Sequence, residues 1–202
     1  MFTGIIETTG KIINKVKKGS NLEITIESQI SSALKPDQSL SHNGVCLTVE
    51  RVNGNTHQVT AIEETLLKTN LGSWQINEHI NLERCLQMNG RIDGHIVQGH
   101  VDTVAICSHI VQKEGSVELS FEIDKKFAAL IIEKGSICLN GISLTIFNIG
   151  TNTFTVAIVP FTFTHTNMQQ LTISSPVNIE FDMIGKYVAR MMGAGSALNE
   201  NN

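Results

Sequence analysis

The strongest constraint on the fold of this 202-residue chain is an internal repeat. The segment NGVCLTV at residues 43–49 returns as NGISLTI at residues 140–146, an offset of 97 positions. Two more pairs keep this offset: ETLLKTN at 64–70 matches FTFTHTN at 161–167, and INLE at 80–83 matches VNIE at 177–180. Three segments in one register predict that the chain contains two copies of one fold.

The beginning of each copy is also repeated, with a slightly different spacing. The segment TGIIETTG at residues 3–10 matches QGHVDTVA at 98–105 with an offset of 95, so two residues are inserted between the repeated blocks. The two copies therefore meet near residues 91–94. We expect one domain at residues 1–93, a second at 94–182, and a terminal segment at 183–202.

Short alternating segments within each copy predict antiparallel strands. Apolar residues alternate in LEITIE (22–27), VELSFEI (117–123) and TFTVAIV (153–159), and turn-forming residues separate such segments. About ninety residues per copy with almost no helix favour a closed barrel over an open sheet, because closure removes the exposed sheet edges. The expected fold is all-β, with two similar closed antiparallel six-stranded Greek-key β-barrels.

A few helices are expected beside the strands. Apolar positions recur every three or four residues at 28–35 and 125–135, which predicts one short helix in each copy. Residues 182–195 place Ile184, Tyr187, Val188 and Met191 on one face of a C-terminal helix. Packing of this face on its own barrel and packing on another subunit are equally compatible with the pattern.

Composition excludes several classes of protein. Hydrophobic residues make up 41% of the chain and charged residues 17%, which are globular proportions. The net charge of −4 and the absence of a long basic run argue against a nucleic-acid partner. No apolar run is long enough to span a bilayer, so no membrane segment is expected. The N-terminal segment has no basic lead and contains Glu7, so we expect no secretory signal and a cytoplasmic location.

The cysteines and histidines do not form a recognisable metal motif. The four cysteines, at positions 46, 85, 107 and 138, include no CxxC pair, and we expect them to be reduced. His95 and His100 are five residues apart, which would place them on opposite faces of a strand and argues against a shared metal ion. No metal site is therefore expected.

Several motifs in order resemble the riboflavin synthase and lumazine protein family. They are MFTGIIE at the start, the paired NGxxLT blocks, GHIVQGHVD at 94–102 and VNIEFDMIGKY at 177–187, and the similarity extends to about residue 190. Family members that bind one chromophore without turnover often lack the GHxxxGH element, whereas this chain has both His95 and His100. The resemblance favours an enzyme, with a non-catalytic lumazine or flavin carrier as the alternative.

The resemblance implies a reaction between two identical substrates. Two molecules of 6,7-dimethyl-8-ribityllumazine exchange a four-carbon unit, giving riboflavin and 5-amino-6-(ribitylamino)uracil in the last step of riboflavin biosynthesis, with no metal or other cofactor. It also implies a homotrimer in which each active site lies between the N-terminal barrel of one subunit and the C-terminal barrel of its neighbour. Lumazine synthase is a further candidate partner.

The resemblance also assigns the residues that line the two lumazine sites. Threonine hydroxyls and backbone amides suit a pyrimidinedione edge, and threonines at matching positions in both repeats favour binding over a plain strand role. The expected N-terminal site is Gly4, Ile5, Ile6, Cys46, Leu47, Thr48, Thr60, Ala61, Ile62, Glu63, Glu64 and Thr65. The expected C-terminal site is Gly99, His100, Val101, Ser143, Leu144, Thr145, Ala157, Ile158, Val159, Pro160, Phe161 and Thr162. Lys134 is a further expected substrate-binding residue.

Catalytic candidates are residues at which the two repeats disagree, because the two bound molecules must react differently. His100 can accept a proton near neutral pH. Cys46 or Ser143 can add to the ring or hold a hydroxide against it, although a strand thiol is more often a small buried hydrophobe. Lys134 and Asp182 can stabilise charge or bind ribityl hydroxyls. The resemblance adds Ser39, and we expect His95 to have a structural role.

Overall fold

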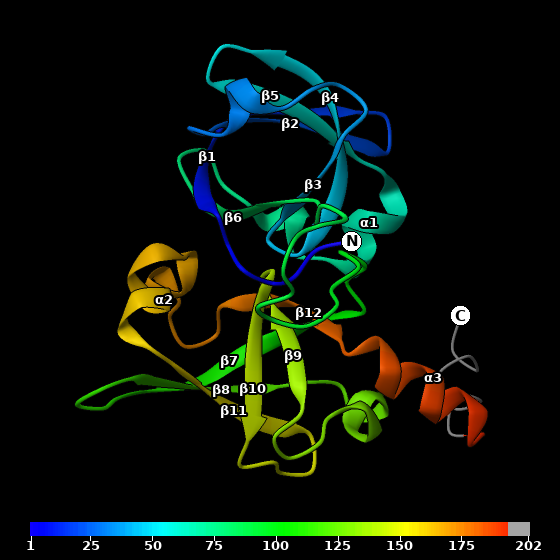
Figure 1. Ribbon diagram of the computed structural model, residues 1–202, viewed down its shortest axis with the longest axis vertical. Helices are drawn as coiled ribbons and strands as arrows, with labels where there is room; N and C mark the ends of the chain where they lie inside the picture. The colour runs from blue at the N-terminus through cyan, green and yellow to red at the C-terminus, as the bar shows by residue number, and fades with distance from the viewer. Residues whose placement is uncertain (194–202) are drawn as a thin grey trace.

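The computed structural model describes residues 1–193, which form two closed six-stranded barrels (Figure 1). The part of the expected terminal segment beyond residue 193 lies outside the described residues. The strands of the N-terminal barrel are β1 (Thr8–Lys18), β2 (Asn21–Glu27), β3 (Ser39–His42), β4 (Val45–Asn53), β5 (Thr56–Ala61) and β6 (His79–Arg84). Those of the C-terminal barrel are β7 (Thr103–Gln112), β8 (Val117–Glu122), β9 (Ser136–Leu139), β10 (Ile142–Phe147), β11 (Thr153–Ile158) and β12 (Pro176–Phe181).

The two barrels have the same topology. Around the N-terminal barrel the strand order is β1-β2-β5-β4-β3-β6, and around the C-terminal barrel the equivalent strands follow in the same cyclic order. Neighbouring strands are antiparallel throughout both rings, for example Leu40 opposite Leu47 and Ile142 opposite Leu139. The expected pair of similar all-β Greek-key barrels is confirmed.

Each barrel encloses its own hydrophobic core, and the alternation of residues along the strands explains why. In β2, Ile24 and Ile26 are fully buried, whereas Glu27 is exposed. In β8, Leu119 and Phe121 are fully buried in the same way. The inward positions of a closed sheet must be filled by side chains, so alternation of period two gives one packed interior per repeat.

The helices differ from the expectation. Residues 28–35 and 125–135 contain only the 3₁₀ segments η1 (Ser31–Ala33) and η3 (Lys125–Leu130), so the predicted lengths were wrong. Two short α-helices were not predicted. The remaining segments are α1 (Glu63–Lys68), η2 (Leu71–Ser73), α2 (Pro160–His165), η4 (Asn167–Gln170) and the expected C-terminal helix α3 (Met183–Met191).

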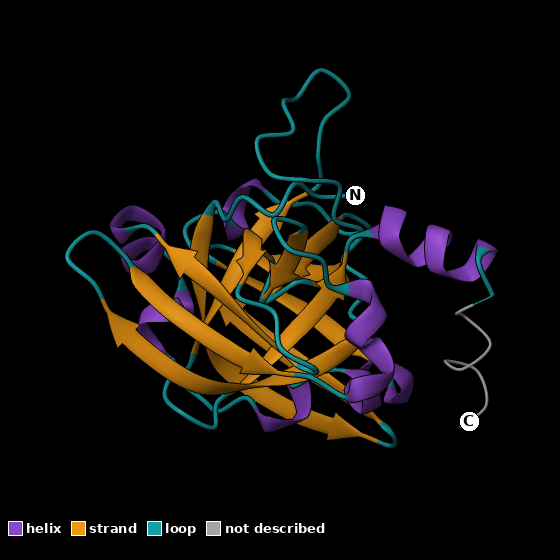
Figure 2. Cartoon of the chain, turned by 90° about the horizontal axis from the view of Figure 1, so that it is seen from below, coloured by secondary structure: helices purple, strands orange, loops and turns teal. Residues whose placement is uncertain are grey.

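The helices are peripheral to the strands, and α3 stands away from the barrels towards the C-terminus (Figure 2). Its apolar face is largely exposed, with Ile184 67%, Tyr187 66% and Met191 86% accessible to solvent. Within residues 1–193 no helix combines the length and apolar character needed to cross a membrane.

Six buried asparagines join the barrels, three from each repeat at the same offset of 97. The Asn81 side-chain amide donates to the Asn140 carbonyl, and the Asn178 amide donates to the Asn43 carbonyl, both at 2.9 Å. The third repeat-related pair, Asn70 and Asn167, belongs to the same hydrogen-bond network. No buried side-chain nitrogen or oxygen in the described part of the chain lacks a hydrogen-bond partner. These contacts fix the two barrels relative to each other.

Candidate functional site

The leading segment of each repeat crosses to the other barrel. The Ser143 amide on β10 donates to the Gly4 carbonyl at 2.8 Å, and the Cys46 amide on β4 donates to the Gly99 carbonyl at 2.9 Å. Between the crossing segments, Phe2 and Val97 form a two-residue bridge. The N-terminus accordingly lies between the barrels (Figure 1). The two strands that carry NGxxLT therefore each receive a loop from the opposite repeat. We call these the crossing loops, the first around Gly4 and the second around Gly99.

Glycine is required at both crossing points. Gly4 and Gly99 have φ angles of +76° and +81°, which residues with a side chain rarely adopt. A Cβ on Gly99 would lie 2.6 Å from Cys46 Cβ, and one on Gly4 would lie 2.6 Å from Ser143 Cβ. The backbone of each loop thus approaches the strand more closely than any other residue type allows.

The crossover places the two leading loops on the opposite barrels from those in the expected grouping of site residues. We expected residues 4–6 in the N-terminal site and residues 99–101 in the C-terminal site. In the structure Ile6 packs against the core of the C-terminal barrel, and Val101 packs against the core of the N-terminal barrel. The repeat reveals which loops are equivalent, but equivalence alone does not say on which barrel each loop lies.

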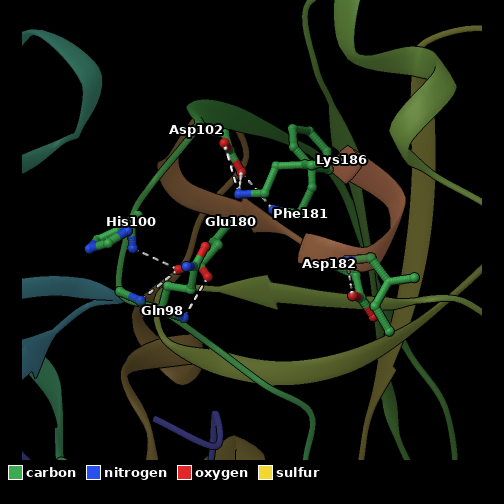
Figure 3. A network of polar contacts seen from close by, with 9 residues as sticks. Gln98, His100, Asp102, Glu180, Phe181, Asp182 and Lys186 are labelled. Atoms are coloured by element: carbon green, nitrogen blue, oxygen red, sulfur yellow. Dashed lines mark hydrogen bonds and ion pairs between the residues drawn. The ribbon is translucent and has the colours of Figure 1, made fainter. Parts of the chain in front are cut away.

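A buried carboxylate holds each crossing loop. Glu180 on β12 accepts the amides of Gln98 at 2.6 Å and of Gly99 and His100 at 2.8 Å, and the His100 ring points away from this carboxylate (Figure 3). Glu83 on β6 accepts the amides of Thr3 at 2.6 Å and Gly4 at 3.0 Å.

Burial raises the pKa of both carboxylates, while these amide donors oppose the shift. The Glu180 side chain is 2% exposed and that of Glu83 is 4% exposed. For Glu180 the largest effect on the pKa is burial, opposed by the Gln98 amide and by the charge of Lys186. For Glu83 burial again comes first, opposed by the hydroxyl and amide of Thr3. Each carboxylate shapes one loop.

A cavity of about 300 Å³ lies where the second crossing loop meets the N-terminal barrel. Its volume is at the lower end of the range for small-molecule sites. The wall combines a thiol, threonine hydroxyls, a carboxylate, a lysine and an imidazole, so it offers donors and acceptors around a compact space. The lining residues are Val45, Cys46, Glu64, Thr65, Lys68, Thr69, Gly99, His100 and Val101.

Some predicted site residues cannot contact a ligand through their side chains. Leu47, Ala61 and Ile158 point into the barrel cores and are at most 5% exposed, so only their backbones are available. The threonines Thr48 and Thr145 are exposed on the outer faces of β4 and β10. Half-buried or exposed positions also include Thr60, Ile62, Glu63, Leu144, Ala157, Val159, Pro160, Phe161 and Thr162.

The Cys46 thiol does not ionise readily to the thiolate. Burial raises its pKa, and a hydrogen bond with the Ser39 side chain opposes that rise. Because its pKa is raised, Cys46 is mainly protonated at neutral pH. The reactive form of a cysteine is the thiolate. Ser39 lies on the neighbouring strand β3, beside a separate hollow of about 730 Å³ that also contains Arg84, Cys85 and Glu7.

Ser143 has a partner that the sequence did not predict. His95 Nδ1 lies 2.7 Å from Ser143 Oγ. Residues 94–100 are an irregular segment and not a strand, so the expectation of two histidines on opposite strand faces was wrong. His95 instead contacts the C-terminal barrel, and His100 lies at the N-terminal cavity. The GHxxxGH motif contained this signal, but it did not say which side chain His95 would meet.

Among the described residues no hydrogen bond joins Lys134 or Asp182 to His95 or His100, although the negative charge of Asp182 acts on His95 and opposes the lowering of its pKa by burial. Asp182 caps α3 by accepting the Ile184 amide at 2.9 Å, and it borders an apolar hollow of about 550 Å³ beside α3. Lys134 is exposed in a turn with φ +63°, and its Nζ lies 5.8 Å from the centre of the Phe147 ring.

The hollow of about 730 Å³ beside Ser39 and the hollow of about 550 Å³ beside Asp182 lie at equivalent positions in the two repeats. Ser39 and Cys85 border the hollow on the N-terminal barrel, and their repeat counterparts Ser136 and Asp182 border the one on the C-terminal barrel. The first is polar, whereas α3 makes the second apolar. Among residues 1–193, no group of three or more histidine, cysteine, aspartate or glutamate side chains is arranged to hold a metal ion.

Comparison with known proteins agrees with this geometry. The family model described as lumazine binding domain matches twice, at residues 3–85 and 98–182. The riboflavin synthase of Bacillus subtilis (strain 168) is 40% identical over 193 residues, which cover 95% of this chain and 90% of that protein. The riboflavin synthases of Actinobacillus pleuropneumoniae and Escherichia coli (strain K12) are 38% and 33% identical, covering 95% and 90% of this chain and 90% and 87% of their own lengths.

Solved structures share the fold at lower sequence identity. The crystal structure of LumP complexed with riboflavin has a TM-score of 0.84 and 23% identity, and it covers 90% of this chain and 100% of that one. The complex of LumP with 6,7-dimethyl-8-(1'-D-ribityl) lumazine has a TM-score of 0.81 and 22% identity, covering 89% and 98%. At this level of identity the likeness establishes the arrangement of the barrels.

Proposed function

This chain belongs to the riboflavin synthase family, whose members it matches over nearly its whole length with two lumazine-binding domains, and we propose that it makes riboflavin from two lumazine molecules. Two molecules of 6,7-dimethyl-8-ribityllumazine are the substrates, and riboflavin and 5-amino-6-(ribitylamino)uracil are the products. The enzyme is a transferase, since one substrate gives a four-carbon unit to the other.

The observation that carries this proposal is the pair of equivalent strands, each closed by a glycine loop from the opposite repeat. A reaction between two identical molecules needs two similar sites that hold them in a fixed mutual orientation. Well-oriented reactants can have effective molarities of about 10⁵ to 10⁸ M, equivalent to about 7 to 11 kcal/mol of barrier. A single general base contributes less, about 10²- to 10⁴-fold.

We assign the two lumazine sites according to the crossover. The site on the N-terminal barrel uses residues 99–101 with residues 46–48 and 60–65, and includes the cavity of about 300 Å³. The site on the C-terminal barrel uses residues 4–6 with residues 143–145 and 157–162, and Lys134 is a further proposed substrate-binding residue. Backbone amides and threonine hydroxyls hold the pyrimidinedione edge.

The catalytic roles follow the differences between the sites. His100 beside Cys46 serves as a proton acceptor for one bound molecule. Ser143 supports addition to the ring of the other. Ser39, Lys134 and Asp182 bind ribityl hydroxyls or stabilise charge at the boundary between subunits, and Ser39 and Asp182 each border a hollow that is open in a single chain.

We propose a homotrimer in which residues 1–93 and 94–182 are the lumazine-binding units and residues 183–202 are the oligomerisation segment. The exposed apolar face of α3 and the apolar hollow beside it support this assembly. In the trimer an N-terminal site of one subunit faces a C-terminal site of the next.

A cytoplasmic location agrees with the four cysteines being unpaired. Lumazine synthase is a further proposed partner.

The test is a reaction with the lumazine as the sole organic substrate. Purified protein is incubated with 6,7-dimethyl-8-ribityllumazine in buffer, and the products are separated and measured by fluorescence and absorbance. We expect one riboflavin and one ribitylaminopyrimidine for every two lumazines consumed. Binding of the lumazine without any riboflavin formation would instead identify the protein as a carrier, which is the alternative function.

A further inference from the structure

We propose that His95 is a positioning residue for the reaction, which holds the Ser143 hydroxyl through Nδ1 and receives its proton. This inference rests on the proposed function and adds a residue to the site on the C-terminal barrel. The evidence is the contact of 2.7 Å between His95 Nδ1 and Ser143 Oγ, which has the length of a strong hydrogen bond between a nucleophile and a base.

The backbone around His95 is built to make this contact. Gly94 lies so close to Thr3 and Ser143 that a Cβ at this position would lie 2.7 Å from Ser143 Cβ and 2.9 Å from Ser143 Oγ. The His95 amide donates to the Thr3 carbonyl at 3.1 Å, and the Ser143 amide donates to the Gly4 carbonyl at 2.8 Å. The backbones of both partners are therefore held by hydrogen bonds, and their side chains lie within hydrogen-bond distance of each other.

The ionisation of His95 suits a proton acceptor. Burial lowers the pKa of His95, and the negative charge of Asp182, at the start of α3, opposes this shift. The imidazole is therefore mainly neutral at pH 7. With its proton on Nε2, the ring leaves Nδ1 free to accept from the serine hydroxyl, and the Ser143 lone pairs are then directed towards a bound ligand.

The contact has no counterpart in the other repeat. On the N-terminal barrel the Cys46 amide donates to the Gly99 carbonyl, and among the described residues no histidine side chain is hydrogen-bonded to the Cys46 thiol. The repeat thus pairs a protonated thiol on one barrel with a serine joined to an imidazole on the other. This difference gives two otherwise similar sites different chemistry.

The proposed step balances without another reactant. As Ser143 Oγ bonds to the electron-poor ring carbon of the bound lumazine, the hydroxyl proton moves to His95 Nδ1. The electron pair displaced from the attacked ring double bond is delocalised through the conjugated ring onto the pyrimidinedione carbonyl oxygens, so an anionic ring and an imidazolium are formed together. Reversal breaks the bond between oxygen and carbon and returns the proton to the serine.

The experiment compares His95→Asn, Ser143→Ala and the double variant in the full-length protein. Asparagine can accept the serine hydrogen bond but cannot take up a proton. We expect kcat for riboflavin formation to fall about 100-fold or more in each single variant, with KM within about threefold of the wild type, and no further fall in the double variant. His109→Asn is the matched control, because His109 Nδ1 contacts Ser108 Oγ at 3.2 Å on the exposed face of β7 and should leave kcat unchanged.

The possible outcomes separate this inference from the proposed function. Wild-type kcat in His95→Asn, or losses that multiply in the double variant, would overturn the pairing of His95 with Ser143 while riboflavin formation by the wild type persists. Absence of riboflavin from the wild type would instead overturn the function. If His95→Asn does not fold, nitrogen NMR of the wild type decides: the inference requires an unprotonated Nδ1 whose resonance shifts in Ser143→Ala, and a protonated Nδ1 contradicts it.

Discussion

Glu180 and its repeat equivalent Glu83 are single residues, yet the carboxylate of each holds a crossing loop in shape. The Glu180 carboxylate accepts three backbone amides of residues 98–100, two of them on the same oxygen. A carboxylate has only acceptor sites and can satisfy all three donors, whereas an amide offers one acceptor oxygen. The charge is therefore needed to present Gly99 and His100 to the cavity.

We predict that Glu180→Gln destabilises the protein by about 1 to 3 kcal/mol and weakens ligand binding at the N-terminal barrel. The new side-chain NH₂ would face backbone N–H donors, so the crossing loop must move. Urea denaturation and titration with riboflavin measure the two effects. Glu122→Gln is the control, because this exposed carboxylate accepts only the Asn152 side chain among the hydrogen bonds found and should change stability by less than about 0.5 kcal/mol. Equal behaviour of the two variants would contradict the prediction.

Sequence could identify such residues but not their partners. INLE and VNIE marked Glu83 and Glu180 as equivalent, and GHxxxGH marked His95 and His100. The contacts of these residues span 48 to 82 positions in the chain, and no local pattern encodes a hydrogen bond across that separation. For this reason the sequence predicts only a general structural role for His95 and no contact with Ser143.

At the scale of elements, the sequence predicts long strands and helices better than short ones. The strands alternate over six or more residues in several places, which is enough to detect a period of two. The helices α1 and α2 have six residues each, fewer than two turns, so no helical period can be recognised in them. Helix α3 has nine residues and one apolar face, and it was predicted.

The apolar face of α3 leads to a prediction about assembly. Val188 is 48% exposed and Met191 is 86% exposed in a single chain, so charges at these positions should not disturb the fold. We predict that Val188→Asp/Met191→Asp is a folded monomer that binds riboflavin at its N-terminal barrel but forms riboflavin at least 100-fold more slowly, because the two sites no longer face each other. Sedimentation and turnover measurements test this.

The control for the assembly prediction is Arg190→Asp, which adds a carboxylate to the same helix outside the apolar face. We expect this variant to assemble and turn over like the wild type. A Val188→Asp/Met191→Asp protein that still sediments as a trimer, or a monomer with full activity, would show that α3 does not bring the sites together.

At the scale of the whole molecule, the sequence predicts the duplication. It does not predict that the leading loop of each repeat lies on the barrel of the other. Two separate barrels and two barrels with exchanged loops have the same repeat pattern, because exchange preserves every equivalence. The asparagines that lock the barrels together were also visible as matched positions, and only the structure shows that their amides donate across the junction. The repeat predicts the fold class, whereas only the contacts between the copies show on which barrel each leading loop lies.

The two barrels differ in the ionisable groups of their interiors. In the N-terminal barrel, His42 Nε2 lies 3.0 Å from His57 Nε2, His57 Nδ1 lies 2.8 Å from Ser31 Oγ, and His42 Nδ1 lies 3.0 Å from the Leu40 carbonyl. One neutral arrangement satisfies every contact: Ser31 donates to His57, His57 donates to His42, and His42 donates to the carbonyl. The equivalent positions in the C-terminal barrel are Ala128, Leu139 and Phe154.

Protonation of this pair opposes folding. Burial lowers the pKa of His57 to about 4, and burial together with the charge of His57 lowers the pKa of His42 well below its usual value. Between the unfolded pKa of about 6.5 and these folded values, the unfolded chain binds protons that the folded chain does not. The stabilisation is therefore complete above pH 6.5 and is lost as the pH falls, by about 1.4 kcal/mol per pH unit for each histidine.

We predict that the free energy of unfolding falls steeply between pH 6.5 and pH 4.5 and that Ser31→Ala/His42→Leu/His57→Phe, which gives the N-terminal barrel the residues of the C-terminal one, removes most of this slope. Urea denaturation at half-unit intervals of pH measures it. His109→Leu, at an exposed histidine, should keep the wild-type slope. Because apolar residues already fill the same positions in the second barrel, acid should open the N-terminal barrel first, and an unchanged slope in the triple variant would place the acid-sensitive group elsewhere.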